Sequence, residues 1–141
     1  EIEEACEFAA AHEFIKKLPL GYDTKIGENG VKLSGGQKQR ISIARAIIKE
    51  PKVLILDDCL SAVDTNTENI ILENLKKIMT DRTTIVISHR ISSVKLAKKI
   101  LVIKEGQVIE KGSHKELIKM NGLYNKLYIQ QIEEDKMLKT N

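Results

Sequence analysis

The sequence predicts an α/β fold in which parallel strands are flanked by helices. Two short aliphatic runs, residues 53–56 and 83–88, have apolar side chains on both faces, as buried parallel strands do. Between them, apolar residues repeat at helical spacing over residues 66–79. A strand–helix–strand order of this kind places two parallel strands in one sheet.

Composition sets the class of molecule. The chain has 141 residues, of which 42% are hydrophobic and 30% charged, as expected for one soluble globular domain. No apolar run approaches the length of a membrane span, and the net charge of +3 is too small and too mixed to indicate nucleic-acid binding. Collagen-like, disulfide-scaffold and disordered classes are excluded.

The elements before the first strand follow from breakers and periodicity. An amphipathic helix is predicted over residues 1–18, and Pro19 ends it. A glycine-punctuated loop follows over residues 21–30. A second helix is predicted over residues 37–49, and Pro51 ends that one.

After the second strand, a short basic helix is predicted over residues 92–98. The segments 100–103 and 107–110 flank Glu105-Gly106, which predicts a β-hairpin. Two further helices are expected, one beginning at Ser113 and one ending near Met137.

The cysteines and the ends of the chain carry less information. Cys6 and Cys59 lie far apart and form no C-x-x-C pair, so a reduced, cytosolic environment is expected. No N-terminal targeting segment is recognisable. Because the chain opens on Glu1 rather than Met, we expect it to be a piece of a longer protein.

The strongest motif is Leu33-Ser34-Gly35-Gly36-Gln37, at a predicted helix start. Gly35 and Gly36 leave backbone N–H groups unobstructed, and with the helix dipole these groups make an anion site. Ser34 adds a hydroxyl donor. The alternative is that Ser34 and Gln37 only form a capping box. Both interpretations can hold together, because a capped, glycine-faced helix start still binds phosphate.

Two aspartates follow the first strand. Carboxylates at the carboxyl end of a parallel strand lie where α/β sheets bind ligands. Asp57 could hold Mg²⁺ directly or through water, because hard cations take oxygen ligands, and Asp58 could orient or deprotonate a water. The alternative is that both residues cap the next turn.

His89 follows the second strand within Ser88-His89-Arg90. A histidine there can reach a terminal phosphate, whereas the alternative is an ordinary surface histidine. His12 and His114 are interpreted only as structural residues, and Cys59 as an ordinary small residue.

The order and spacing of these motifs resemble those of the ABC-type ATPase family. Leu33–Gln37 resembles the family signature, Val53–Asp58 the Walker B strand, Ser61–Asp64 the D-loop and His89 the switch histidine. The resemblance implies a P-loop NTPase-like ABC ATPase core, present only in part, together with part of the helical subdomain. It extends to about Gln131.

Further motifs resemble exporters within that family. Residues 25–30, with Glu28 at the acidic position, resemble the loop that ABC exporters point at their membrane helices. The resemblance implies that residues 1–50 are part of the helical subdomain and residues 51–131 the C-terminal part of the ATPase core. Residues 132–141 form a polar tail that is expected to fray.

The resemblance also implies roles, ligands and partners. The expected ligands are ATP and Mg²⁺, and the expected partners are a second nucleotide-binding domain, identical or different, and a transmembrane domain, without nucleic acid. The expected location is the cytoplasmic face of the cell membrane. The implied site residues are Ser34, Gly35, Gly36 and Gln37 for the γ-phosphate of the partner's ATP, Asp57 for Mg²⁺, Asp58 for the attacking water, Asp64 at the dimer interface and His89 as γ-phosphate sensor.

The first departure from the family pattern is a missing phosphate-binding loop. No G-x-x-x-x-G-K-[ST] phosphate loop is present, and the nearest candidate, residues 27–34, has the wrong spacing. We therefore expect the C-terminal part of a nucleotide-binding domain, which lacks activity alone.

The second departure is Asp58, which stands where the family usually has Glu. Its carboxylate is about 1.5 Å shorter in reach, so a slow, degenerate site in a heterodimer is expected. A harmless variant is the alternative at this position. Two other functions remain open: a soluble ABC ATPase of translation or DNA repair, and a folded module without nucleotide chemistry.

Overall fold

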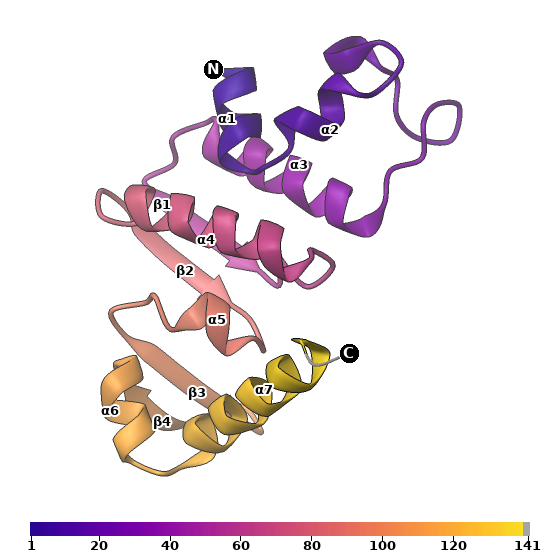
Figure 1. Cartoon of the computed structure of the whole chain (residues 1–141). Coiled ribbons are helices and arrows are strands. Elements are labelled where there is room, and N and C mark those ends of the chain that lie inside the picture. The colour runs from indigo at the N-terminus through magenta and orange to yellow at the C-terminus, as the bar shows by residue number, and fades with distance from the viewer. Residues whose placement is uncertain (140–141) are drawn as a thin grey trace. The chain divides into compact units, whose positions relative to one another are not determined.

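The computed structural model describes residues 1–139, which form two compact units, Glu1–Ile87 and the part that begins at Ser88. Figure 1 shows the order of their helices and strands along the chain. The first unit contains a parallel strand pair with four helices, and the second contains an antiparallel hairpin with three. Within the described residues, no helix is long and apolar enough to cross a membrane.

The sheet of the first unit consists of β1 (Val53–Asp57) and β2 (Thr83–Ile87). The strands pair in parallel, with the first and the last residues of the two strands opposite each other. The helix α4 (Thr65–Ile78) connects them. The predicted α/β arrangement with parallel strands is therefore confirmed.

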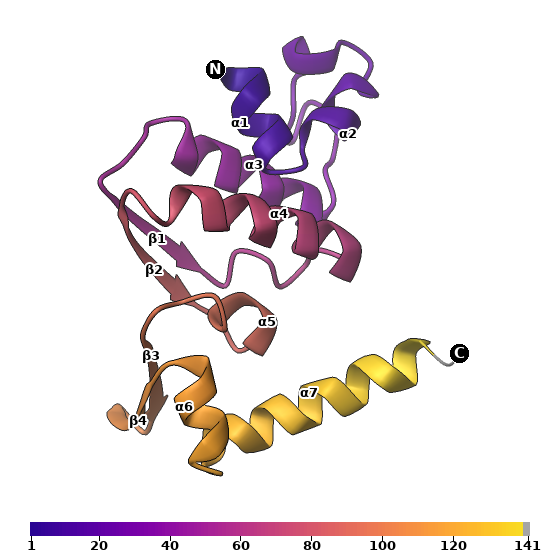
Figure 2. The ribbon, with the colours of Figure 1, turned by 60° about the vertical axis from the view of Figure 1, so that its left-hand side comes forward.

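Burial of this sheet differs from the prediction of two buried faces. Leu54 and Leu56 are 2% and 3% exposed, whereas Val53 and Ile55 are 54% and 60% exposed. Successive side chains point to opposite faces, so one face of β1 is covered and the other is open among the described residues. In both views α3 (Gly35–Ile47) and α4 run side by side, and α3 packs against β1 (Figures 1 and 2).

The predicted helix over residues 1–18 is wrong as a single element. It consists of α1 (Ile2–Phe8) and α2 (His12–Lys16), separated by a break at which Ala10 has a φ of 53°. A short 3₁₀ turn, η1 (Gly21–Asp23), follows.

Contacts distant in sequence explain this break. The Asn74 side-chain amide donates to the carbonyl of Phe8 at 3.0 Å, and the Arg40 guanidinium donates to that of Ala10 at 2.6 Å. These bonds satisfy carbonyls that a continuous helix would have used internally. The neighbouring Ala9 and Ala11 are fully buried, which leaves no room for larger side chains.

The second unit is built on the predicted hairpin. β3 (Ile100–Lys104) and β4 (Gln107–Gly112) pair antiparallel around Glu105 and Gly106, both with positive φ, as a type I′ turn requires. The helix α5 (Ile91–Val94) is shorter than the predicted 92–98. The buried core residues are Ile91, Ile100, Leu117 and Tyr124.

Two helices, α6 (His114–Lys119) and α7 (Leu123–Lys139), end this unit. Ser113 caps α6 through a capping box with Glu116, as predicted for a helix starting there. The Glu110 carboxylate accepts from the backbone N–H groups of Leu123 and Tyr124 and so caps α7.

The tail predicted to fray, residues 132–141, is helical as far as Lys139. The helix continues because helix-compatible residues follow one another without a breaker. A Gln130–Glu134 side-chain hydrogen bond of 2.9 Å, one turn apart, supports it. Residues 140 and 141 lie outside the described part.

Candidate functional site

The start of α3 has the predicted capping box. The backbone N–H of Gln37 donates to the Ser34 hydroxyl at 3.2 Å, and the Gln37 side-chain oxygen accepts from the Ser34 N–H at 2.9 Å. A hydroxyl that accepts one hydrogen bond still has its own proton to donate. The capping interpretation is therefore correct and leaves Ser34 able to contact an anion.

The same helix start has the electrostatics of an anion site. The N–H groups of Gly35 and Gly36 lie in the first turn, where helix geometry provides no internal acceptor. The first turn of α3 contains no acidic residue, so the positive end of the dipole is not neutralised there. This end of α3 can bind a phosphate group through backbone donors.

Gly36 has a second role that the sequence did not reveal. A Cβ atom at this position would lie 2.6 Å from the carbonyl oxygen of Ala62, a distance that real Cβ contacts do not reach. A Cβ at Gly35 would lie 3.3 Å from the Ala62 side chain. The start of α3 therefore lies directly against the loop of residues 58–64, which we name the aspartate loop.

Gln39 makes the second contact between α3 and the aspartate loop. Its side-chain Nε2 donates to the Ser61 hydroxyl at 2.9 Å and to the Asp58 carbonyl at 3.3 Å. Its Oε1 accepts from the Ala62 N–H at 2.9 Å. Gln39 is not among the site residues predicted from the sequence. Its position one turn after Gly35 and Gly36, on the same helix face, is the signal that could have identified it.

Asp57 and Asp58 lie at the carboxyl end of β1, as predicted. Asp57 is the last strand residue and is exposed. Asp58 adopts a φ of 43°, and its N–H donates to the carbonyl of Ile87 at 2.8 Å. The Ser61 hydroxyl donates to the Asp58 carbonyl at 3.1 Å, so the backbone of Asp58 forms the turn that leaves the strand.

Asp64 caps α4. Its carboxylate accepts from the N–H of Thr67 at 3.0 Å, and hydrogen bonds from Thr67 lower its pKa from the ordinary value. The charge of Arg40 contributes in the same direction as a smaller cause. Asp64 therefore has a local structural role whatever else it contacts.

His89 belongs to the second unit, whereas Ser34–Gln37, Asp57, Asp58 and Asp64 belong to the first. Gln131 holds the turn around His89: its Nε2 donates to the His89 carbonyl at 2.8 Å, and its Oε1 accepts from the Ile91 N–H at 2.8 Å. Within the first unit, the structure places the start of α3 against the loop that contains Asp58 and Asp64.

The other two histidines are structural, as expected. His12 and His114 form hydrogen bonds of 2.8 Å with the hydroxyls of Tyr22 and Tyr124, respectively. Burial raises the pKa of the Cys59 thiol to about 11, so the group stays neutral near pH 7, as for an ordinary small residue.

No preformed cage for a metal is present in residues 1–139, where no three His, Cys, Asp or Glu side chains cluster suitably. Mg²⁺ commonly uses one or two carboxylates and takes its other ligands from water and phosphate. The Asp57 carboxylate, exposed at the strand end, suits that mode of binding.

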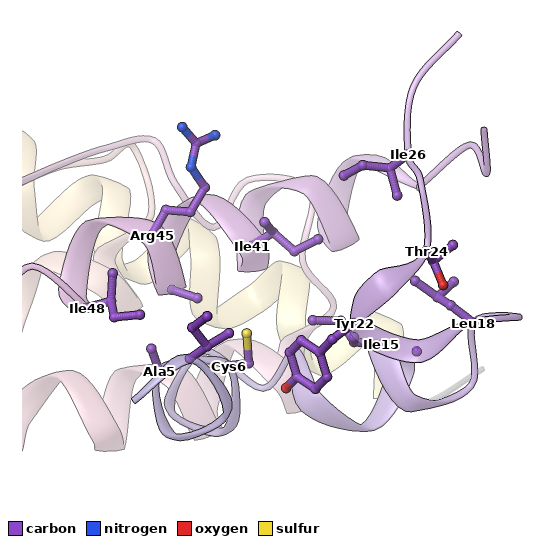
Figure 3. A pocket seen from close by; sticks show the side chains of 13 residues that line it. Ala5, Cys6, Ile15, Leu18, Tyr22, Thr24, Ile26, Ile41, Arg45 and Ile48 are labelled. Atoms are coloured by element: carbon purple, nitrogen blue, oxygen red, sulfur yellow. The ribbon is translucent and has the colours of Figure 1, made fainter. Parts of the chain in front are cut away.

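An apolar pocket of about 320 Å³ lies in the first unit, apart from the aspartate loop. Figure 3 shows side chains from α1, α3 and the segment after α2 around it, with the Arg45 guanidinium directed away from them. Burial and a hydrogen bond with Cys6 raise the pKa of Tyr22, which lines this pocket, to about 12. Ile26, in the loop resembling that of exporters, also lines the pocket.

Comparison with known proteins identifies similar sequences. The family model described as ABC transporter matches residues 2–61. The chain is 53% identical over 127 residues to ABC transporter B family member 2 of Dictyostelium discoideum. That match covers 90% of this chain and 9% of the relative. It is also 53% identical over 128 residues to the ATP-dependent lipid A-core flippase of Legionella pneumophila, covering 91% and 22% of the two chains.

A solved structure of an ABC exporter has a similar fold over most of this chain. A bacterial Atm1-family ABC exporter with ATP bound matches with a TM-score of 0.86 and 44% identity, over 93% of this chain and 23% of that one. The chain thus spans less than a quarter of the length of these relatives.

Proposed function

This chain belongs to the ABC transporter family, with the sequence and fold of part of the exporter ATP-binding domain, and on that premise we propose that it powers export. In the whole protein, ATP and water are converted to ADP and phosphate, and the associated change in domain contacts drives transport of a substrate across a membrane. The observation that carries the proposal is the capped, glycine-faced start of α3 packed on the aspartate loop.

The start of α3 acts on the γ-phosphate of ATP held by a second nucleotide-binding domain. The Ser34 hydroxyl and the N–H groups of Gly35 and Gly36 donate to phosphate oxygens, with Gln37 close by. Phosphoryl transfer depends mainly on positioning and on stabilisation of charge, which fixed backbone donors provide without reorganisation. Asp64 contacts the second domain, and His89 senses the γ-phosphate.

The carboxylates of Asp57 and Asp58 belong to a second ATP site, the one whose Walker B strand this chain provides. Asp57 would hold Mg²⁺ with phosphate and water oxygens, and the ion would neutralise charge on the phosphates. Asp58 orients the attacking water, but with a shorter reach than the Glu usual in the family. We infer a slow site of this kind in a heterodimer, in which the intact Ser34–Gln37 segment completes a competent site with the partner.

The chain is proposed to work beside membrane helices at the cytoplasmic face of the membrane. The loop of residues 25–30 forms a tight turn, with the N–H of Val31 donating to the Lys25 carbonyl at 3.0 Å, and presents an exposed Glu28. That loop is the proposed contact with the transmembrane domain. The names of the relatives, a lipid A-core flippase and an Atm1-family ABC exporter, favour this function over a soluble ATPase of translation or DNA repair.

Two matched serine substitutions in the full-length protein test this function. Ser34→Ala and Ser113→Ala each remove a capping-box hydroxyl, at a cost of about 1 kcal/mol to the helix. Only Ser34 is proposed to donate to ATP. We expect Ser34→Ala to lower kcat/KM for Mg·ATP by roughly tenfold, as loss of a charge-assisted hydrogen bond does, and Ser113→Ala to leave it within about twofold.

The measurement is phosphate release by the purified transporter in lipid. A wild-type protein that releases no phosphate from ATP would contradict the proposed function. Equal losses in the two variants would show that Ser34 acts only as a cap.

A further inference from the structure

We propose that Gln39 is a positioning residue that makes the aspartate loop respond to the phosphate bound at the start of α3. The inference rests on the proposed function. Because the start of α3 serves the ATP held by the partner, whereas Asp58 serves the ATP on this chain's own side, Gln39 joins elements of two different sites.

The contact uses every strong hydrogen-bonding group of one side chain. The amide nitrogen of Gln39 donates to the Ser61 hydroxyl and the Asp58 carbonyl, and its oxygen accepts from the Ala62 N–H. Glutamine is required for this pattern, because it combines two N–H donors with an acceptor on one planar group. Glutamate would keep the acceptor but lose both donors.

Helix geometry makes this contact sensitive to the phosphate site. Gln39 lies one turn after Gly35 and Gly36 on the same face of α3, within one rigid hydrogen-bonded segment. The close approach of Gly36 to Ala62 is a second contact between the same two elements. A shift of the helix start upon phosphate binding is therefore transmitted to residues 58–62.

The aspartate loop contains a conformation that needs external support. Asp58 has a φ of 43°, which is uncommon for a residue with a side chain and costs roughly 1 kcal/mol or more. Such a conformation persists only where its surroundings hold it. Gln39 is one of the groups that hold the Asp58 carbonyl in place, and through that carbonyl it sets where the carboxylate of the same residue projects.

The test uses the full-length transporter with Gln39→Glu and Gln39→Leu, and with Gln107→Glu as a matched control in β4. We expect both Gln39 variants to lower the single-turnover rate of ATP hydrolysis at this chain's own site by about tenfold, because a misplaced water-orienting group slows the reaction there. KM for ATP should stay within about twofold, since Gln39 does not touch nucleotide. The control should change neither constant.

A double-mutant cycle separates positioning from general stability. Gln39→Leu combined with Ser61→Ala should lower that single-turnover rate no further than Gln39→Leu alone, because both changes disrupt one connection. An unchanged single-turnover rate at this chain's own site in both Gln39 variants would overturn the inference, and so would losses that track a fall in melting temperature and add to that of Ser61→Ala. A wild-type protein without ATPase activity would overturn the proposed function as well. Unchanged rates in the Gln39 variants of an active protein would overturn only the role of Gln39.

Discussion

Asp58 has both a left-handed backbone conformation and a carboxylate that is proposed to orient the attacking water. Its backbone is left-handed, and aspartate is among the side chains found most often in that region. The turn therefore favours a short polar side chain, whereas the proposed reaction favours a longer one that reaches the water. The structure offers a local physical reason for an aspartate at this position, namely the turn that leaves β1.

Lengthening this side chain should raise activity. Glutamate extends the reach of the carboxylate by about 1.5 Å, and displacements of about 1 Å can change rates by on the order of 100-fold. We expect Asp58→Glu in the full-length protein to raise single-turnover hydrolysis of ATP at this chain's own site. The control is Asp81→Glu, the same chemical change in the exposed connection before β2.

An unchanged rate for Asp58→Glu, with expression and assembly equal to wild type, would count against a slow site caused by aspartate. It would support the alternative that the water is repositioned and the variant harmless.

At the scale of elements, α3 is the member that connects the other parts of the first unit. Its start carries the capping box, one face contacts the aspartate loop, and Ile43, Ala44 and Ile47 are buried. The Arg40 side chain reaches Ala10 between α1 and α2, and its guanidinium lies 4.6 Å from the centre of the Phe14 ring. A disturbance of α3 therefore affects the phosphate site and the helical packing together.

Two adjacent glycines allow the packing role of α3 to be tested. Gly36→Ala places a Cβ 2.6 Å from a backbone oxygen, which must move, so we expect a loss of about 1–3 kcal/mol in stability. Gly35→Ala meets only a side chain at 3.3 Å and gains up to about 1 kcal/mol of helix propensity. The melting temperatures of the purified variants provide the measurement.

We expect Gly36→Ala to melt several degrees below wild type and Gly35→Ala to stay close to it. Equal melting temperatures for all three proteins would show that the contact between α3 and the aspartate loop can relax without cost.

At the scale of the whole molecule, the chain contains the residues proposed to contact phosphate and to orient water, but its sequence has no phosphate loop. The sequence has no G-x-x-x-x-G-K-[ST] motif, the element that cradles the nucleotide phosphates. The start of α3 is proposed to contribute a few donors to one end of a nucleotide. Such a small set leaves too little binding energy to offset the cost of immobilising ATP.

Isothermal calorimetry of the 141-residue chain with Mg·ATP tests this expectation. We expect no binding at micromolar concentrations, because the sequence has no G-x-x-x-x-G-K-[ST] loop to cradle the phosphates. The full-length protein is the positive control. Micromolar affinity of the isolated chain would show that it contains a nucleotide site of its own.

Most elements could be predicted, because their signals are local. The capping box of Ser34, the turn at Glu105-Gly106 and the start of α6 at Ser113 each depend on residues within one turn of one another. The candidate site was predicted at the level of single motifs. Gln39 was missed because its partners lie 19 to 23 residues further along the chain.

The sequence by itself determined the order of helices and strands, the parallel pairing of β1 with β2 and the motifs that place the chain in its family. The tertiary structure alone decided three features: the division of residues 1–18 into two helices, the single covered face of β1, and the attachment of α3 to the aspartate loop. Local signals reflect backbone preferences of neighbouring residues, whereas these three features depend on contacts such as that of Arg40 with Ala10, 30 residues apart.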